Sequence, residues 1–341
     1  MGSRPRLSSE LLMCGLFVTL LGAMLLAMCA GSSWISPSAV LSDLGRLVMG
    51  DGSSEIDVRV QFRAPRVVLG MIVGCGLSVA GVVIQTAVRN PLADPYVLGV
   101  SSGASLGAVL LLYALPLKFY GLPLFAAAFC GGAAASLIVY VVGRARGAAS
   151  SSQRLVLAGV ATTYLLSALT SFVLTLVDRQ GFGGSNVFVF WSLGSLARAQ
   201  WDLVLIPTIV VVASLVVLMA LRRRLDVLIV NDEHATALGA EPQKIRRVLF
   251  VVSAALVAAC VAASGPIGFV GLMIPHATRF VVGPFHKRLL PNAALMGATF
   301  LVLADTLGRS IGGSHEVAVG IISAMCGAPC FLILLRRARW T

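Results

Sequence analysis

The chain has 341 residues, of which 58% are hydrophobic and 12% charged, and its formal net charge is +12. A soluble domain carries roughly 25% charged residues, so this composition excludes a soluble protein and indicates a membrane protein with many spans. The basic residues stand in short clusters between apolar runs, which indicates membrane topology rather than nucleic-acid binding. At about 20 residues per span, the length allows roughly ten helices and no soluble catalytic domain.

The apolar runs predict an all-α polytopic fold, with ten membrane-spanning helices in one domain over residues 1–341. No clear cleavage site follows the first run, which we interpret as a retained helix rather than a signal peptide. The eighth run is short and contains Pro275, so we expect that span to be broken or partly buried. In chain order the expected spans are 9–30, 64–88, 94–115, 121–143, 155–177, 201–221, 245–264, 268–283, 289–309 and 316–335.

The distribution of Lys and Arg predicts the orientation, because cytoplasmic loops carry an excess of both. With the N-terminus inside and ten crossings, 18 of the 26 basic residues fall in cytoplasmic segments. An odd number of crossings would put either the basic start or the basic tail of the chain outside. We therefore expect both termini to be cytoplasmic.

Two connections between the spans carry features beyond those of a simple tether. In the outer connection, residues 31–63, an amphipathic stretch near 37–49 predicts an interfacial helix. In the inner one, Asp232 can cap a short helix through Leu238, which Gly239 ends and Pro242 keeps from restarting. An ordered helix in the longest cytoplasmic loop favours docking to a cytosolic partner over a solvated loop.

The segment 89–104 places an Arg, an Asn, an Asp and two prolines between two long apolar runs. Lipid-facing backbone cannot tolerate such a break, because each unsatisfied N–H or C=O group costs several kcal/mol in hydrocarbon. The break is therefore expected to be buried in protein, beside a translocation path.

Motifs of catalysis and nucleotide binding are absent from the sequence. It contains no Gly-x-x-x-x-Gly-Lys-Ser/Thr phosphate loop, no His-Glu-x-x-His and no Gly-x-Ser-x-Gly, and its histidines and cysteines do not cluster at ligand spacing. We expect neither catalysis nor a bound cofactor or metal. The only ionisable residues expected at membrane depth are Asp305 and Glu316, both near an interface, whereas a proton-coupled carrier normally keeps a carboxylate near the midplane. An ion-coupled secondary transporter therefore stays the less favoured alternative.

Several motifs along nearly the whole chain together resemble one family, the FecCD-type permeases. These are the BtuC-like (type II) membrane subunits of ATP-binding cassette (ABC) importers for haem, ferric siderophores and cobalamin. The segments that carry the resemblance are Arg63-Ala64-Pro65-Arg66, Asn90-Pro91-Leu92-Ala93-Asp94-Pro95, Leu98-Gly99-Val100-Ser101-Ser102-Gly103-Ala104, Phe190-Trp191-Ser192-Leu193-Gly194, and the run from Gly265 to His276.

The resemblance implies a homodimer in the bacterial inner membrane, around one translocation path that works by alternating access. Two separate ATPase subunits would use ATP and Mg²⁺, a periplasmic binding protein would deliver the cargo, and this chain would bind no cofactor. The implied cargo is haem first, a ferric siderophore second and cobalamin third.

The resemblance also implies roles for three groups of residues. Arginines before the second span and after the ninth would meet acidic residues of the binding protein, although arginines that snorkel at the headgroups are an alternative; they are Arg63, Arg66 and Arg309. The cytoplasmic gate would come from the Asn-Pro-Leu turn and the loop before the fifth span, with a purely structural turn as the alternative; its residues are Asn90, Leu92, Ser152 and Gln153. The ATPase would hold the loop at about 226–242 through Ala237, Leu238 and Gly239.

Overall fold

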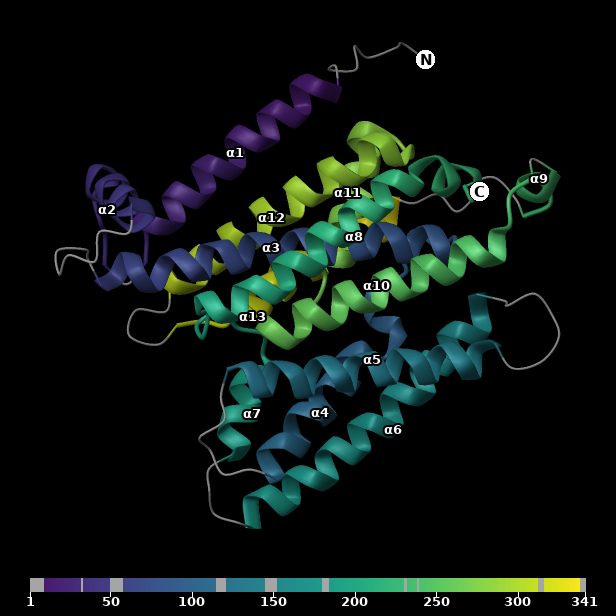
Figure 1. The fold of residues 1–341 in the computed structure, drawn as a ribbon, viewed down its shortest axis with the longest axis horizontal. Coiled ribbons are helices and arrows are strands. Elements are labelled where there is room, and N and C mark those ends of the chain that lie inside the picture. The colour runs from purple at the N-terminus through teal and green to yellow at the C-terminus, as the bar shows by residue number, and fades with distance from the viewer. Residues whose placement is uncertain are drawn as a thin grey trace.

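Helices are the only regular elements in the part of the chain that the structure, a computed structural model, describes. That part comprises residues 9–31, 33–49, 58–114, 121–144, 152–179, 184–229, 232–237, 239–311 and 316–337. The long helices run roughly side by side along one axis of the molecule (Figure 1).

Seven helices are long and apolar enough to cross a membrane, and three shorter apolar helices accompany them. The long ones are α1 (Ser9–Cys29), α3 (Val58–Val88), α5 (Leu122–Arg144), α6 (Ser152–Arg179), α8 (Trp201–Val227), α10 (Pro242–Ser264) and α12 (His286–Ile311). The shorter ones are α4 (Val100–Ala114), α11 (Val270–Val282) and α13 (Val319–Arg337). These ten helices coincide with the ten expected spans, so the prediction of an all-α, ten-span fold is confirmed.

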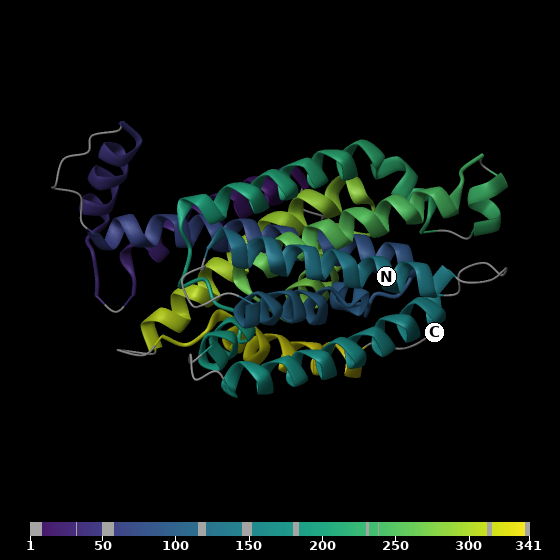
Figure 2. The ribbon, with the colours of Figure 1, turned by 60° about the horizontal axis from the view of Figure 1, so that its bottom comes forward.

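Three short helices mark the two ends of this bundle, and a short 3₁₀ turn lies among the long helices. Helices α2 (Pro37–Met49) and α7 (Gly184–Ser192) lie at one end, here called the α2 end (Figures 1 and 2). Helix α9 (Asp232–Ala237) projects from the opposite end, the α9 end, and the 3₁₀ turn η1 (Pro95–Leu98) leads into α4. Helix α2 confirms the helix expected near 37–49.

Helix α3 forms the centre of the larger group of helices and packs against α8, α10, α11 and α12. Helices α4, α5, α6 and α7 form a second group beside it (Figure 1). Glycines allow the closest approaches: a Cβ atom on Gly74 of α3 would collide with the backbone of Gly297 in α12, and one on Gly103 of α4 with that of Gly131 in α5. Small residues at helix contacts give tight packing inside a membrane, where no hydrophobic effect holds helices together.

Two predictions about helix boundaries need correction. Helix α3 begins at Val58, so Pro65 lies inside it; the carbonyl that this proline leaves unpaired belongs to Gln61, which is exposed. Pro242 does not prevent a helix but opens α10, because a residue in the first helical turn needs no N–H donor. Helix α11 is partly buried as expected, yet it continues unbroken through Pro275.

Candidate functional site

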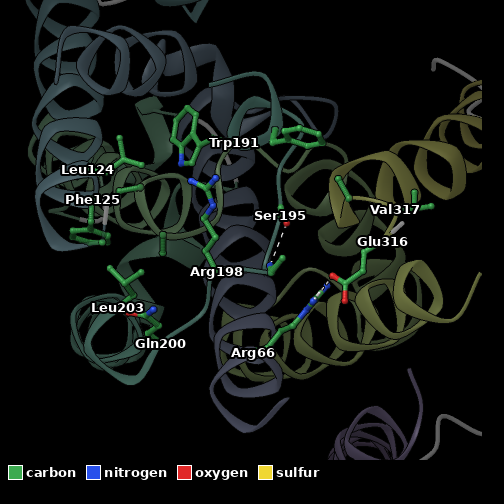
Figure 3. Close-up of a pocket in the computed structure, with 16 residues that line it drawn as sticks. Arg66, Leu124, Phe125, Trp191, Ser195, Arg198, Gln200, Leu203, Glu316 and Val317 are labelled. Atoms are coloured by element: carbon green, nitrogen blue, oxygen red, sulfur yellow. Dashed lines mark hydrogen bonds and ion pairs between the residues drawn. The ribbon is translucent and has the colours of Figure 1, made fainter. Parts of the chain in front are cut away.

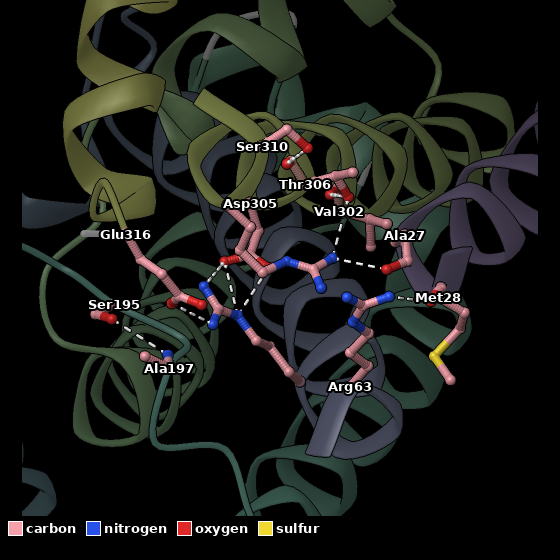
Figure 4. Close-up of polar contacts among 12 residues, drawn as sticks. Ala27, Met28, Arg63, Ser195, Ala197, Val302, Asp305, Thr306, Ser310 and Glu316 are labelled. Carbon is pink, nitrogen blue, oxygen red and sulfur yellow. Dashed lines mark hydrogen bonds and ion pairs between the residues drawn. The ribbon is translucent and has the colours of Figure 1, made fainter. Parts of the chain in front are cut away.

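A buried ion-pair network joins α3, α12 and the residues before α13 at the α2 end (Figure 4). Arg66 donates from Nε to Asp305 Oδ2 at 2.9 Å and from Nη2 to Asp305 Oδ1 at 2.8 Å. Its Nη1 donates to Glu316 Oε2 at 2.6 Å. This paired geometry suits guanidinium and carboxylate and is stronger than a single charged contact. Asp305 and Glu316, expected near an interface, thus serve as partners of one arginine.

The other two arginines of the predicted docking set hold helix α1. Arg63 donates from Nη1 to the carbonyl oxygens of Met28, at 2.8 Å, and Cys29, at 3.1 Å. Arg309 donates from Nη2 to the carbonyl oxygen of Ala27 at 2.8 Å. The last carbonyls of a helix lack helical partners and carry partial negative charge, so cations there are favourable. Since α1 has no basic residue in its own last turn, these two side chains supply its C-terminal cap.

The burial of these arginines corrects the picture of exposed docking residues. Arg63 and Arg66 are 8% exposed and Arg309 is 3% exposed, and all three lie within helices rather than in loops. Burying a charge is costly unless it is paired and hydrogen-bonded, which explains the density of contacts around them. All three arginines lie at the same end of the molecule, the α2 end, as a common docking role requires. Their contact with a binding protein stays a prediction.

Arg66 lines a cavity of about 630 Å³ at the α2 end, whose lining includes neither Arg63 nor Arg309 (Figure 3). Glu316 lines it too, and Arg198 points toward Trp191 across it. Aromatic and aliphatic side chains from α5, α7 and α8 complete its wall. An apolar pocket with a few convergent charges is suited to an anionic group on a partner or ligand. Sequence reasoning missed Arg198, since no motif singles it out.

The segment predicted to form a gate is a compact turn at the α9 end. Asn90 Oδ1 accepts from the Leu92 amide at 2.9 Å, and Asp94 Oδ1 accepts from the Tyr96 amide at 2.8 Å. Asn90 is exposed and Leu92 half-buried, so both side chains can meet another surface. The structure therefore shows the turn itself, which was the alternative to a gate. A gating role for the turn stays a prediction. The other two predicted gate residues, Ser152 and Gln153, begin α6. Their side chains lie outside the described part of the chain.

The predicted coupling segment forms a separate short helix, α9, at the α9 end. Ala237 is its last residue and is exposed. Gly239 follows with φ of +76°, and its amide donates to the carbonyl of Thr236 at 2.9 Å. Glycine adopts this left-handed conformation without strain, which confirms that Gly239 ends the helix. The third predicted residue, Leu238, lies outside the described residues.

A second polar cluster, which sequence reasoning missed, ties α8 to α3 and α12 near the α9 end. Asp226 Oδ1 accepts from the backbone amide of His286 at 2.8 Å and lies 2.7 Å from its Nδ1. The other ring nitrogen, Nε2, lies 2.9 Å from Thr86 Oγ1. Because Asp226 stands just before α9 in the chain, these contacts connect the coupling segment to the centre of the bundle. The three residues are far apart in the sequence, and no spacing pattern links them.

The FecCD transport family matches residues 19–337 of the chain. The chain belongs to the FecCD transport family. Its relatives include the "Cobalamin import system permease protein BtuC" of Halobacterium salinarum, 42% identical over 80% of this chain and 72% of the relative. The "Hemin transport system permease protein HmuU" of Yersinia pestis is 38% identical over 82% of this chain and 83% of the relative.

A solved structure of an ABC transporter has the same architecture. An ABC transporter assigned to the metal-chelate type, in an inward-facing conformation, superposes with a TM-score of 0.82 at 30% identity, over 97% of this chain and all of that one. The chain is therefore a permease subunit of the ABC importer type, and it is a transport component rather than an enzyme.

Proposed function

We propose that this chain forms, as a homodimer, the path by which an ATP-driven importer moves an iron chelate from the periplasm to the cytoplasm by alternating access. The observation that carries the proposal is the family match over residues 19–337, which includes all of the ten apolar helices except the start of α1. Since the sequence lacks a phosphate loop, two separate ATPase subunits supply the energy.

The proposed topology puts the α2 end in the periplasm and the α9 end in the cytoplasm of a bacterium, with both termini cytoplasmic in the inner membrane. The basic residues support it, because the clusters at 222–224 and 244–247 flank α9. At the periplasmic end, the pocket lined by Arg66 and Arg198 would receive an acidic side chain of the binding protein. Arg63 and Arg309 would act in docking indirectly, by holding α1 in place.

At the cytoplasmic end, α9 would fit a groove of the ATPase subunit and transmit its motion to α8 and α10. A rigid helix that joins two spans can convert movement of a partner into relative movement of those spans. Ala237, Leu238 and Gly239 would make this contact. Asn90 and Leu92, with Ser152 and Gln153, would close the path from the same side by packing across the dimer axis.

The proposed cargo is haem, followed by a ferric siderophore and by cobalamin as alternatives. Relatives named for haemin, cobalamin and ferric citrate transport all support the class of large metal chelates. The test is uptake by proteoliposomes that contain this chain, its ATPase and its binding protein, with haemin, ferric citrate and cyanocobalamin offered in turn. ATP-dependent accumulation of haemin would support haem as the cargo. Accumulation of one of the other two chelates instead would identify that chelate as the cargo.

An ion-coupled secondary transporter is the alternative from a different class. It would need an ionisable group near the middle of the membrane. Asp305, the single carboxylate of α12, is instead paired with Arg66 and Arg309 close to the α2 end. Copurification with an ATP-hydrolysing subunit separates the two classes, since a carrier acting alone requires no such partner.

A further inference from the structure

A second cavity, of about 450 Å³, lies between η1, α4, α6 and α7, and most of the residues that line it carry a hydroxyl group. Eight of its ten lining residues carry a hydroxyl, and none of the ten is charged. The two others are Leu174 and Phe188. The hydroxyl-bearing residues, here called the hydroxyl pocket, are Tyr96, Ser101, Ser102, Ser105, Thr163, Ser167, Thr170 and Ser171.

The hydroxyl pocket lies at membrane depth, because its α6 residues occupy the middle of that 28-residue helix. Two of its hydroxyls bond to their own helix backbone: Thr170 donates to the Leu166 carbonyl at 2.8 Å, and Ser102 to the Gly99 carbonyl at 3.0 Å. Such bonds are ordinary in apolar helices. Ser167 and Ser171, however, are exposed on the same face of α6. Polar groups at this depth normally face the bundle interior or a water-filled cavity rather than lipid.

The chemistry of the pocket selects a ligand that offers many hydrogen-bonding oxygens. Hydroxyls both donate and accept, and they add no fixed charge. A conduit must bind its cargo well enough to admit it and weakly enough to release it. Several neutral hydrogen bonds meet both conditions, whereas a buried arginine or carboxylate would hold an opposite charge tightly.

We propose that the hydroxyl pocket is a wet subsite on the translocation path, which binds the carboxylate or carbonyl oxygens of a metal chelate through hydrogen bonds from α4 and α6. This inference rests on the proposed importer function. It assigns a contact with the cargo to α4 and to the middle of α6. Neither the predicted gate residues nor the predicted docking residues provide such a contact.

Thiol labelling tests whether water and cargo reach the pocket. Ser167→Cys is placed in a variant whose seven native cysteines are replaced by alanine, and the assembled complex is treated with a membrane-impermeant methanethiosulfonate. Val212→Cys is the matched control, because Val212 is 52% exposed on the apolar helix α8 and lies outside the pocket. We expect Ser167→Cys to be labelled, Val212→Cys to stay unlabelled, and turnover with the imported chelate to protect Ser167→Cys severalfold.

Transport by the otherwise native chain provides the second measurement. Ser167→Ala combined with Ser171→Ala should raise the KM for chelate import, by about fivefold for each hydrogen bond lost. Thr299→Val is the control: its hydroxyl bonds to the Leu295 carbonyl at 2.8 Å on α12, away from the pocket, and its import should match that of the unmodified chain. In both variants, ATP hydrolysis stimulated by the loaded binding protein should persist.

Three results would overturn the subsite: no labelling of Ser167→Cys, labelling that the imported chelate does not slow, or equal import by the double serine variant and the unmodified chain. The first would indicate a pocket filled by lipid or by the second subunit, and the second a pocket that holds only water. Failure of the importer function itself looks different, because the unmodified complex would then import none of the three chelates.

Discussion

Arg66 and Asp305, 239 residues apart in the sequence, form a two-pronged ion pair inside the bundle, with Nη2 and Oδ1 2.8 Å apart. The pair fixes the start of α3 to the end of α12. Since Glu316 binds the same guanidinium, the segment that leads into α13 is fixed as well. A partner that binds Arg66 in the pocket at the α2 end would therefore act on α3, α12 and the segment before α13 together.

Removal of the central carboxylate should strongly destabilise the chain. Asp305→Ala leaves Arg309 as a buried charge without its carboxylate and Arg66 paired with Glu316 alone, and breaking a buried pair in this way costs about 3–5 kcal/mol. Thermal unfolding of the detergent-solubilised protein measures the loss. Glu241→Ala is the control, because its pair with Lys244 is largely exposed and worth about 1 kcal/mol or less. Equal stability losses would show that the buried network does not hold the helices.

The contact between α3 and α12 should not tolerate a side chain at Gly74. A Cβ atom there would meet the backbone of Gly297, so Gly74→Val forces the two helices apart. We expect a loss of at least about 2 kcal/mol, as for other overpacked sites, seen as a lower melting temperature and aggregation on size-exclusion chromatography. Gly22→Val is the matched control on α1, where nothing lies within 4 Å of a Cβ atom. A stable Gly74→Val protein would contradict the close approach.

Loss of the Asp226–His286 contact should uncouple ATP hydrolysis from import. Asp226→Ala removes the oxygen that binds both the His286 backbone amide and its ring, so α8 is no longer fixed to α12 near α9. The ratio of chelate imported to ATP hydrolysed should fall severalfold while the complex still assembles. Asp202→Ala, at the opposite end of the same helix and exposed, should keep the normal ratio. An unchanged ratio in Asp226→Ala would exclude a coupling role.

Substitutions at Gly239 should separate backbone strain from loss of the ATPase contact. Asparagine tolerates a positive φ, so Gly239→Asn should assemble with the ATPase and import normally. Gly239→Trp adds a bulky side chain at an exposed position with open space around it, and should block seating of α9 in its groove. Pull-down of the ATPase subunit reports the difference. Normal assembly of Gly239→Trp would place the contact elsewhere.

Much of the fold could be predicted, because lipid imposes simple rules on length, hydropathy and charge. Apolar runs located all ten membrane-spanning helices, and the turn residues around Gly239 located the end of α9. The start of α3 was placed too late, because Pro65 and two arginines do not resemble the interior of a membrane helix. Their contacts with α1 and Asp305 make that interior position possible.

The candidate site was harder to predict because its contacts join distant parts of the chain. The family resemblance identified Arg63, Arg66 and Arg309 as candidate docking residues, and the structure shows that each is bound within its own chain. Neither the Asp226–His286 contact nor the hydroxyl pocket follows from local spacing. The serines and threonines of α4 and α6 become one feature only when the two helices pack together.

The most direct test of the account is cargo uptake by sealed vesicles under two energy sources. One set contains the purified chain alone with a proton or sodium gradient, and the other contains the chain with its ATPase and loaded binding protein, with ATP but no gradient. We expect the chelate to accumulate only in the second set, at a rate that follows ATP hydrolysis. Accumulation by the chain alone, driven by the ion gradient, would contradict it.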